Sequence, residues 1–213
     1  MTSCRLDPNA RPWPIDAVAA TIRPLISGAM AKDQPKPRDA QGPLDLAKWI
    51  AANAAAFRPP VANKVVFPGS ELIFMVVRGP NARNDFHINP GDEIFYQLEG
   101  TIAVDIRHDD GRIERRLVGK GEVMLVPGGT AHSPRRPRDT WGIVIERERR
   151  PGEIDQIAWF CERCGNELRR APFELSDIET ELAPIIANFN ADAHARRCSR
   201  CGAVLPVAGE FVL

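Results

Sequence analysis

The chain has no excess charge of either sign, because 28 Lys and Arg residues balance 28 Asp and Glu residues. This balance excludes a global field that would attract nucleic acid or an anionic membrane, and it favours a small-molecule partner. The sequence also lacks an apolar run of about 18 residues, the length that a membrane-spanning helix needs. Its first residues lack the basic and apolar regions of a secretory signal. We therefore expect a cytoplasmic protein with no membrane partner.

Cysteine is scarce, but most of it is paired. Four of the five cysteines lie in "CERC" at 161–164 and "CSRC" at 198–201. In a reducing compartment such pairs are typical of metal thiolates rather than disulfides. The alternative is a dithiol redox motif, which normally begins a helix after a strand, a context that this sequence lacks. We predict a closed, structural metal site with four thiolate ligands: Cys161, Cys164, Cys198 and Cys201.

The distribution of residue types divides the chain into three parts. Residues 1–42, rich in Pro, Ala and charge, are predicted to form an N-terminal extension and linker. Residues 43–150 begin with one helix and continue as the main, catalytic domain. Residues 151–213 form a small metal-binding module with one helix from about Ser176 to Asn190.

The central part of the chain, from Val65 to about Glu148, consists of short β-branched and aromatic runs separated by Gly and Pro turn signals. The runs expected to form strands are "KVVF", "ELIFMVVRG", "EIFYQLEG", "TIAVDIRHDDG", "RIERRLVGKG", "EVMLVPGG" and "WGIVIER". No helical pattern interrupts them. Closely spaced short strands of this kind indicate an antiparallel sandwich or barrel, so the fold class is mainly β.

Two spaced motifs place metal-binding side chains in that sheet. Residues 121–132, "GEVMLVPGGTAH", follow the pattern G-x5-P-x-G-x2-H, and residues 79–100 follow G-x5-D-x-H-x5-E-x6-G. They resemble the two signatures of the cupin family, which implies a double-stranded β-helix or jelly-roll barrel whose metal ligands are His87, Glu93 and His132. Asp85 stands where many cupins carry another histidine, and we expect it to orient a ligand imidazole from outside the coordination shell.

This ligand set has a definite chemistry. Two imidazoles and one carboxylate on one face of an octahedron leave positions open, as in non-haem Fe(II) oxygenases. Zinc accepts similar ligands but has no redox chemistry. A metal-free cupin is the structural alternative.

Longer phrases are more specific. Taken in order, "GPNARNDFH", "DEIFYQLEG", "HSPRRP", "IERERRPG", "AWFCERCGNEL" and "RRCSRCG" resemble bacterial-type 3-hydroxyanthranilate 3,4-dioxygenase, which carries a rubredoxin-like second metal site. The resemblance implies Fe(II)- and O₂-dependent ring opening of 3-hydroxyanthranilate. The product would be 2-amino-3-carboxymuconate semialdehyde, a precursor of quinolinate and NAD. It also implies a homodimer and an iron ion at the cysteine site, where Zn would fit the same four ligands.

The resemblance assigns roles to further residues. Arg83 and Arg136 match the pair that binds the substrate carboxylate, for which a guanidinium fork is well suited. Glu146 matches the carboxylate that accepts a proton from the substrate, and Asn63 matches a position near the pocket. The structural alternative for the arginines is a solvated basic loop.

Two functional alternatives remain open at the level of sequence. Residues 1–42 have no counterpart in the resemblance, so the chain could be a paralogue that acts on a ring-substituted 3-hydroxyanthranilate in secondary metabolism. The second alternative is a metal-binding cupin that acts as an isomerase or ligand-binding protein.

Overall fold

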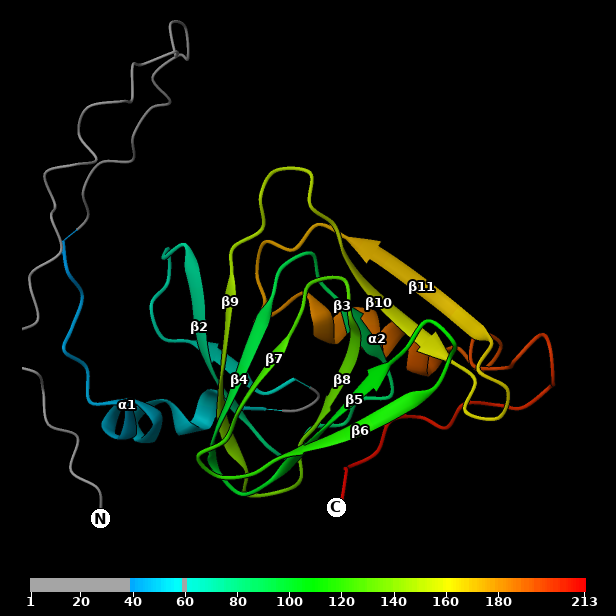
Figure 1. The fold of residues 1–213 in the computed structure, drawn as a ribbon, viewed down its shortest axis with the longest axis horizontal. Coiled ribbons are helices and arrows are strands. Elements are labelled where there is room, and N and C mark those ends of the chain that lie inside the picture. The colour runs from blue at the N-terminus through cyan, green and yellow to red at the C-terminus, as the bar shows by residue number, and fades with distance from the viewer. Residues whose placement is uncertain (1–38, 59–60) are drawn as a thin grey trace, which may run out of the picture. The chain divides into compact units, whose positions relative to one another are not determined.

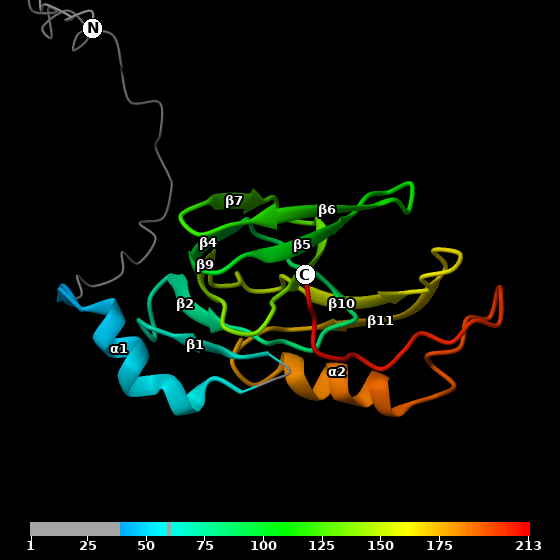
Figure 2. The ribbon, with the colours of Figure 1, turned by 90° about the horizontal axis from the view of Figure 1, so that it is seen from below.

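Two antiparallel sheets face one another in this protein (Figures 1 and 2). The computed structural model describes residues 39–58 and 61–213. Their strands are β1 (Asn63–Val65), β2 (Leu72–Arg78), β3 (Phe86–Ile88), β4 (Glu93–Glu99), β5 (Ile102–Arg107), β6 (Ile113–Val118), β7 (Val123–Val126), β8 (Ala131–Arg135), β9 (Trp141–Arg147), β10 (Asp155–Phe160) and β11 (Glu167–Phe173). One sheet has the order β1-β2-β9-β4-β7, and the other has the order β11-β10-β3-β8-β5-β6. The predicted mainly β barrel is confirmed.

Alternation along the strands decides which side chains face the interior. In β4, Glu93, Phe95 and Gln97 are buried, whereas Ile94 and Tyr96 between them are exposed. This period of two is the pattern of a strand with one face on the core. The strand therefore carries both core residues and a charged side chain into the space between the sheets.

Four strands were missed by the sequence analysis: β3, β8, β10 and β11. β3 is only three residues long, and β8 and β11 contain Pro134 and Pro172. Proline cannot donate to a ladder, so a strand that contains it gives a weak sequence signal. β11 lies at the edge of its sheet, a position in which a strand tolerates proline.

The first helix, α1 (Leu46–Asn53), continues into the short 3-10 turn η2 (Ala54–Ala56). Asp45 caps α1, since its side chain accepts a hydrogen bond from the backbone N–H of Lys48. The helix packs against a small core cluster around Phe57 and Val76. The predicted helix in this part of the chain is confirmed, while the predicted extension before it lies outside the described residues, apart from its last few positions.

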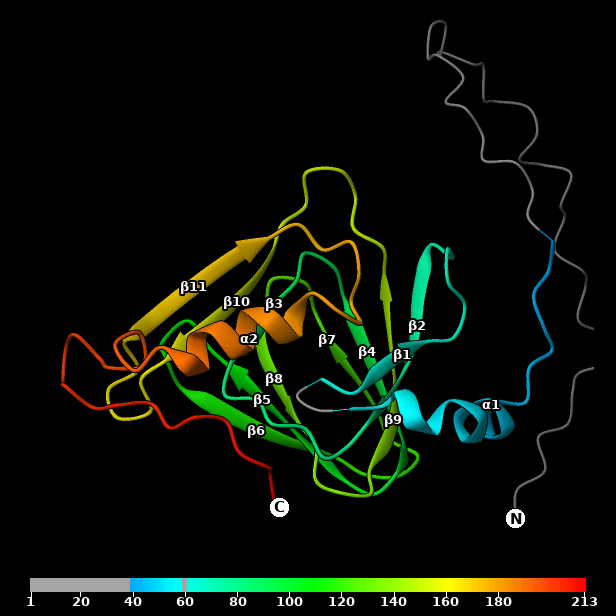
Figure 3. The ribbon, with the colours of Figure 1, turned by 180° about the vertical axis from the view of Figure 1, so that it is seen from behind.

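The second helix, α2 (Leu182–Ala191), packs over β10 (Figure 3). The Phe189 ring stacks on Trp159 with centroids 4.1 Å apart. The predicted start at Ser176 is wrong by six residues, because Asp177 accepts hydrogen bonds from Glu179 and Thr180 and holds a turn there. Asp side chains compete with a helix in this way.

The end of the chain is joined closely to the barrel. β10 pairs with β3, and β11 pairs with β10, so both strands extend the six-stranded sheet. Residues 41–213 form one compact unit, and the predicted boundary at residue 150 stays a prediction. Within the described residues no helix combines the length and the apolar character needed to cross a membrane.

Candidate active site

The three predicted metal ligands meet between the sheets. His87 on β3 is the cross-strand partner of His132 on β8, and Glu93 begins β4 in the opposite sheet. The three side chains are buried, with relative exposures of 4%, 1% and 4%. Because strands of a barrel are stiff, ligands held in this way keep their geometry when other coordination positions exchange partners.

The distances between the donor atoms suit one metal ion. Nδ1 of His87 lies 3.5 Å from Oε1 of Glu93, and Nε2 of His132 lies 3.3 Å from Oε2 of the same carboxylate. All three ligand atoms lie within 4.8 Å of one another. Ligand atoms about 2.1 Å from a metal and at right angles to each other lie about 3 Å apart. The three side chains therefore fit one face of a metal's coordination shell.

Each imidazole is oriented through its second nitrogen. Nε2 of His87 lies 2.7 Å from Oδ2 of Asp155, and Nδ1 of His132 lies 2.9 Å from the carbonyl oxygen of Thr130. These contacts direct the remaining nitrogens toward Glu93, as outer partners of metal-bound histidines commonly do. The expectation that Asp85 orients an imidazole is wrong, because Asp85 pairs with Arg83 instead.

The charges of this cluster depend on one another. Burial lowers the pKa of His87, but hydrogen bonds to Asp155 and Glu93 outweigh it and raise the pKa to about 9. Burial raises the pKa of Glu93, yet the two imidazoles hold it well below its usual range. A metal ion that binds here must displace the proton on His87.

The two predicted carboxylate-binding arginines differ in their partners. Arg83 forms a two-point contact with Asp85, with Nε–Oδ1 at 3.1 Å. Arg136 is 1% exposed and has no carboxylate partner among the described residues; its Nη1 lies 3.4 Å from the amide oxygen of Gln97. Burial and the nearby Arg83 lower the pKa of Arg136 to about 10. A buried, unpaired guanidinium calls for an anionic ligand.

Glu146 on β9 has one occupied and one free oxygen. Its Oε2 lies 2.8 Å from Nη2 of Arg149 and 3.3 Å from Nδ2 of Asn89. Its Oε1 is buried and has no hydrogen-bond partner within the described part of the chain. Burial, together with the charge of Glu93, raises the pKa of Glu146, although Arg149 counteracts this. The free oxygen can accept a proton.

Asn63 lies on the wall of the same chamber, and its Nδ2 donates to the carbonyl oxygen of Ile178 at 3.0 Å. Apolar side chains form much of the remaining wall: Met75, Val77, Phe95, Val144 and Leu182. The chamber measures about 50 Å³, which is small for an aromatic ligand.

Sequence reasoning missed three residues of this site: Asn89, Arg149 and Asp155. All three are polar groups that support Glu146 or His87 rather than lie in a motif. Arg149 stands in the basic run "RERR", which by itself indicates a solvated segment. No local signal distinguishes it from its neighbours.

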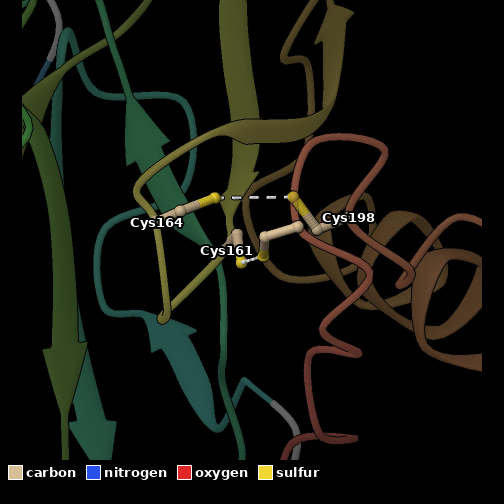
Figure 4. Close-up of side chains that lie close together, drawn as sticks. Cys161, Cys164 and Cys198 are labelled. Atoms are coloured by element: carbon tan, nitrogen blue, oxygen red, sulfur yellow. Dashed lines mark hydrogen bonds between the residues drawn. The ribbon is translucent and has the colours of Figure 1, made fainter.

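The four paired cysteines form a second cluster at the far end of β10 (Figure 4). Sγ of Cys161 lies 3.5 Å from Sγ of Cys201, and Sγ of Cys164 lies 3.6 Å from Sγ of Cys198. Four sulfurs at about 2.3 Å from a tetrahedral metal would lie about 3.8 Å apart, far beyond disulfide length. The cluster therefore fits a closed four-thiolate metal site.

Both knuckles share the same local geometry. In each, the first cysteine's carbonyl oxygen accepts a hydrogen bond from a glycine four residues later, Gly165 at 2.8 Å and Gly202 at 2.9 Å. These glycines have φ of 70° and 73°, a left-handed conformation that favours glycine. The repeat "C-x2-C-G" thus forms two equivalent halves of one site.

Comparison with known proteins agrees with this geometry. A family model described as 3-hydroxyanthranilic acid dioxygenase matches residues 39–190. The chain is 42% identical to a 3-hydroxyanthranilate 3,4-dioxygenase of Bacillus cereus over 76% of this chain and 91% of that protein. It is 38% identical to the enzyme of the same name from Candida albicans, over 76% of this chain and 94% of that protein.

Among solved structures, a cupin-2 domain-containing protein of Shewanella frigidimarina aligns with a TM-score of 0.40 and 19% identity. It covers 50% of this chain and 95% of its own. At this distance the likeness carries no functional argument.

Proposed function

The chain belongs to the 3-hydroxyanthranilic acid dioxygenase family, and we propose that it opens the ring of 3-hydroxyanthranilate with O₂ at an Fe(II) ion bound by His87, Glu93 and His132. One observation carries the proposal: the metal ligands share a buried chamber with Arg136, whose guanidinium has no carboxylate partner among the described residues, and with Glu146, which has one free oxygen there. The substrate offers a carboxylate to the first and an acidic hydroxyl to the second.

The donor set suits Fe(II), since two nitrogens and one carboxylate on one face leave adjoining positions for substrate and O₂. When bound, the ion supplies the redox chemistry by which an electron-rich aminophenol and O₂ react. The residues of the chain bind the substrate, orient it and accept its proton.

Arg136 supplies most of the attraction for the substrate carboxylate. It is buried and has no carboxylate partner among the described residues, whereas the charge of Arg83 is shared with Asp85. Arg83 contributes a second donor group at the same wall. A guanidinium fork matches a planar carboxylate at two points, so Arg136 orients the substrate ring and also increases the affinity for the substrate.

Glu146 accepts the proton that the substrate loses on binding. Its free Oε1 is the acceptor, because Oε2 is held by Arg149 and Asn89. The raised pKa of Glu146, caused by burial, makes it a better base than a solvated carboxylate. Meanwhile the apolar wall around Phe95 and Val144 excludes water from the reacting ring.

Transient absorbance after anaerobic mixing tests this function. Protein loaded with Fe(II) and 3-hydroxyanthranilate should stay colourless until O₂ is added, and a near-ultraviolet band of the muconate semialdehyde should then rise and decay. The same protein loaded with Zn(II) is the control. Absence of the band with full Fe(II) occupancy, or turnover of ring-substituted substrates alone, would contradict the proposal.

For the cysteine cluster we propose a structural ion, Fe or Zn, because four thiolates leave no position for a substrate. Metal analysis of the purified protein, combined with the absorbance of ferric thiolate, distinguishes the two metals. A site without metal would contradict the structural role.

We also propose a cytoplasmic homodimer. An apolar outer face supports self-association: Ile94, Tyr96, Val123 and Leu125 on β4 and β7 are 38%, 37%, 64% and 53% exposed. Light scattering should give twice the 23.5 kDa chain mass. A Val123→Glu, Leu125→Glu double variant should be monomeric, and a wild-type monomer would refute the dimer.

A further inference from the structure

A single buried guanidinium connects the two chemically different parts of the active site. Arg149 lies two residues after the end of β9, and its side chain is only 5% exposed. Its Nε lies 2.6 Å from Oδ1 of Asp155, and its Nη2 lies 2.7 Å from Oδ2 of that residue. The same Nη2 lies 2.8 Å from Oε2 of Glu146. One side chain therefore holds two carboxylates.

Each carboxylate performs a separate task. Asp155 uses Oδ2 to hold Nε2 of His87 at 2.7 Å, which directs the opposite nitrogen toward Glu93. Glu146 is held at Oε2 and presents Oε1 to the chamber. A displacement of Arg149 would release both.

We propose that Arg149 is a positioning residue that sets the orientation of the metal ligand His87, through Asp155, and of the proton acceptor Glu146 at the same time. The inference rests on the proposed function and extends it to a residue outside the metal ligands and the substrate-binding pair. Arg149 does not line the chamber, so its effect passes through the two carboxylates.

The geometry of arginine explains why this residue type stands here. Its planar fork carries donors on Nε and Nη2 that match both oxygens of Asp155, and Nη2 also forms an ion pair with Oε2 of Glu146. Nη1 donates to the carbonyl oxygen of Arg147 at 2.9 Å, which fixes the fork in its plane. A lysine ammonium lacks this fork and cannot satisfy both carboxylates in one plane.

The surroundings of Arg149 allow a direct chemical test. Its side chain also lines an outer cavity of about 490 Å³, together with Phe67, Leu72, Glu148 and Leu175. A small cation from solvent can therefore reach the place of the guanidinium once the side chain is truncated. Guanidinium ion should restore function to Arg149→Ala, whereas the longer side chain of Arg149→Met fills the space and prevents rescue.

The experiment measures metal binding separately from turnover. The cysteine site is first filled with one molar equivalent of Zn(II) per chain, which soft thiolates select, and the barrel site is then titrated with Mn(II), which prefers nitrogen and oxygen ligands to thiolates. Free Mn(II) is followed by its paramagnetic resonance signal. In Arg149→Ala we expect the Mn(II) dissociation constant to rise about 10- to 100-fold. With Fe(II), kcat should fall about 10²- to 10⁴-fold.

Arg147→Met is the matched control. Arg147 forms an equally short two-point pair with Glu153, at 2.6 and 2.7 Å, but these side chains are 29% and 22% exposed and do not line the chamber. Its loss should leave Mn(II) affinity and kcat within about twofold, as for surface ion pairs generally. Arg149→Lys keeps the buried positive charge and tests the inference if the alanine variant does not fold; it should lose at least about tenfold in kcat.

Double variants separate the two tasks. In an Asp155→Asn background, Arg149→Ala should no longer change Mn(II) affinity, because the connection to His87 is already broken. In a Glu146→Gln background, the loss of bound metal should account for any further fall in kcat that Arg149→Ala causes. The inference would be overturned if Arg149→Ala changed Mn(II) affinity and kcat by the same factors in these backgrounds as in the wild type.

Two further outcomes are informative. Folded Arg149→Ala and Arg149→Lys proteins with unchanged Mn(II) affinity and kcat would overturn the positioning role while the proposed function stands. A wild-type protein that binds no Mn(II) in the barrel and has no activity with Fe(II) would instead overturn the proposed function, and the inference with it.

Discussion

The barrel site and the cysteine site hold metal-binding groups in the same chain, yet they differ in almost every other respect. The barrel ligands His87, Glu93 and His132 come from strands of two facing sheets, while the cysteines stand in two turns of repeated geometry. Around the barrel ligands lie buried polar atoms without partners, including Oε1 of Glu146 and Oδ1 of Asn63. No sulfur of the cysteine cluster is left without a neighbour.

This difference separates chemistry from stability. A site with three protein ligands and free polar groups in its wall can take up a substrate. Those buried groups without partners lower the stability of the fold. Four thiolates complete the coordination of their ion, so its binding energy contributes to folding. Variants of the two sites should therefore fail in different ways.

The largest effect is expected from His87→Ala. Removal of a ligand opens the coordination shell and leaves Asp155 without its imidazole partner. Loss of a residue that only orients a ligand costs up to about 100-fold, so kcat should fall by more than that here. Steady-state oxygen consumption with 3-hydroxyanthranilate measures the loss, and circular dichroism checks that the barrel is retained. Turnover at the wild-type rate would show that His87 is not a metal ligand.

Glu146→Gln comes next. The amide keeps the shape of the side chain but cannot accept a proton, so kcat should fall about 10²- to 10⁴-fold with the metal still bound. Stopped-flow absorbance and metal analysis measure the two quantities separately. An equal loss of metal and activity would instead assign Glu146 to the metal shell.

Arg136→Met should act on substrate affinity. Loss of a buried charge partner costs about 2–5 kcal/mol, which corresponds to a KM higher by about 30-fold or more. 2-Aminophenol, which has the ring of the substrate without its carboxylate, should bind the variant and the wild type with the same affinity. A raised KM for 2-aminophenol as well would indicate a distorted chamber rather than a lost carboxylate contact.

The smallest effect on turnover is expected from Cys161→Ser. If the lost thiolate costs about 3 kcal/mol, Tm should fall by about 6–12 °C for a chain of this size. The rate per folded, Fe(II)-loaded molecule should stay within about twofold. A large loss of kcat at unchanged Tm would show that the two sites do not divide chemistry and stability between them.

Much of the candidate site could be predicted from the sequence, because both metal motifs combine a distinctive set of donor residues with close spacing. His87 and Glu93 are six residues apart, and each cysteine pair spans four. The strands that carry two of the ligands, β3 and β8, were nevertheless missed. β3 is held by pairing with β8 and β10 rather than by its own propensity.

The supporting residues could not be predicted, because their contacts depend on strand register. Asp155 meets His87 across 68 residues, since β10 pairs with β3. Asp85, only two residues from His87, was the natural local choice. It pairs instead with Arg83, which contacts both oxygens of its carboxylate.

The sequence by itself determined which chemical groups are present and how they are spaced: two imidazoles and a carboxylate in two motifs, and four thiolates beside two glycines. Only the tertiary structure decided which carboxylate meets which partner, leaving Arg136 unpaired and placing Arg149 between Asp155 and Glu146. The reason is physical. Donor types and spacing are local properties of the chain, whereas the pairing of buried charges depends on distant strands brought into one register by the whole core.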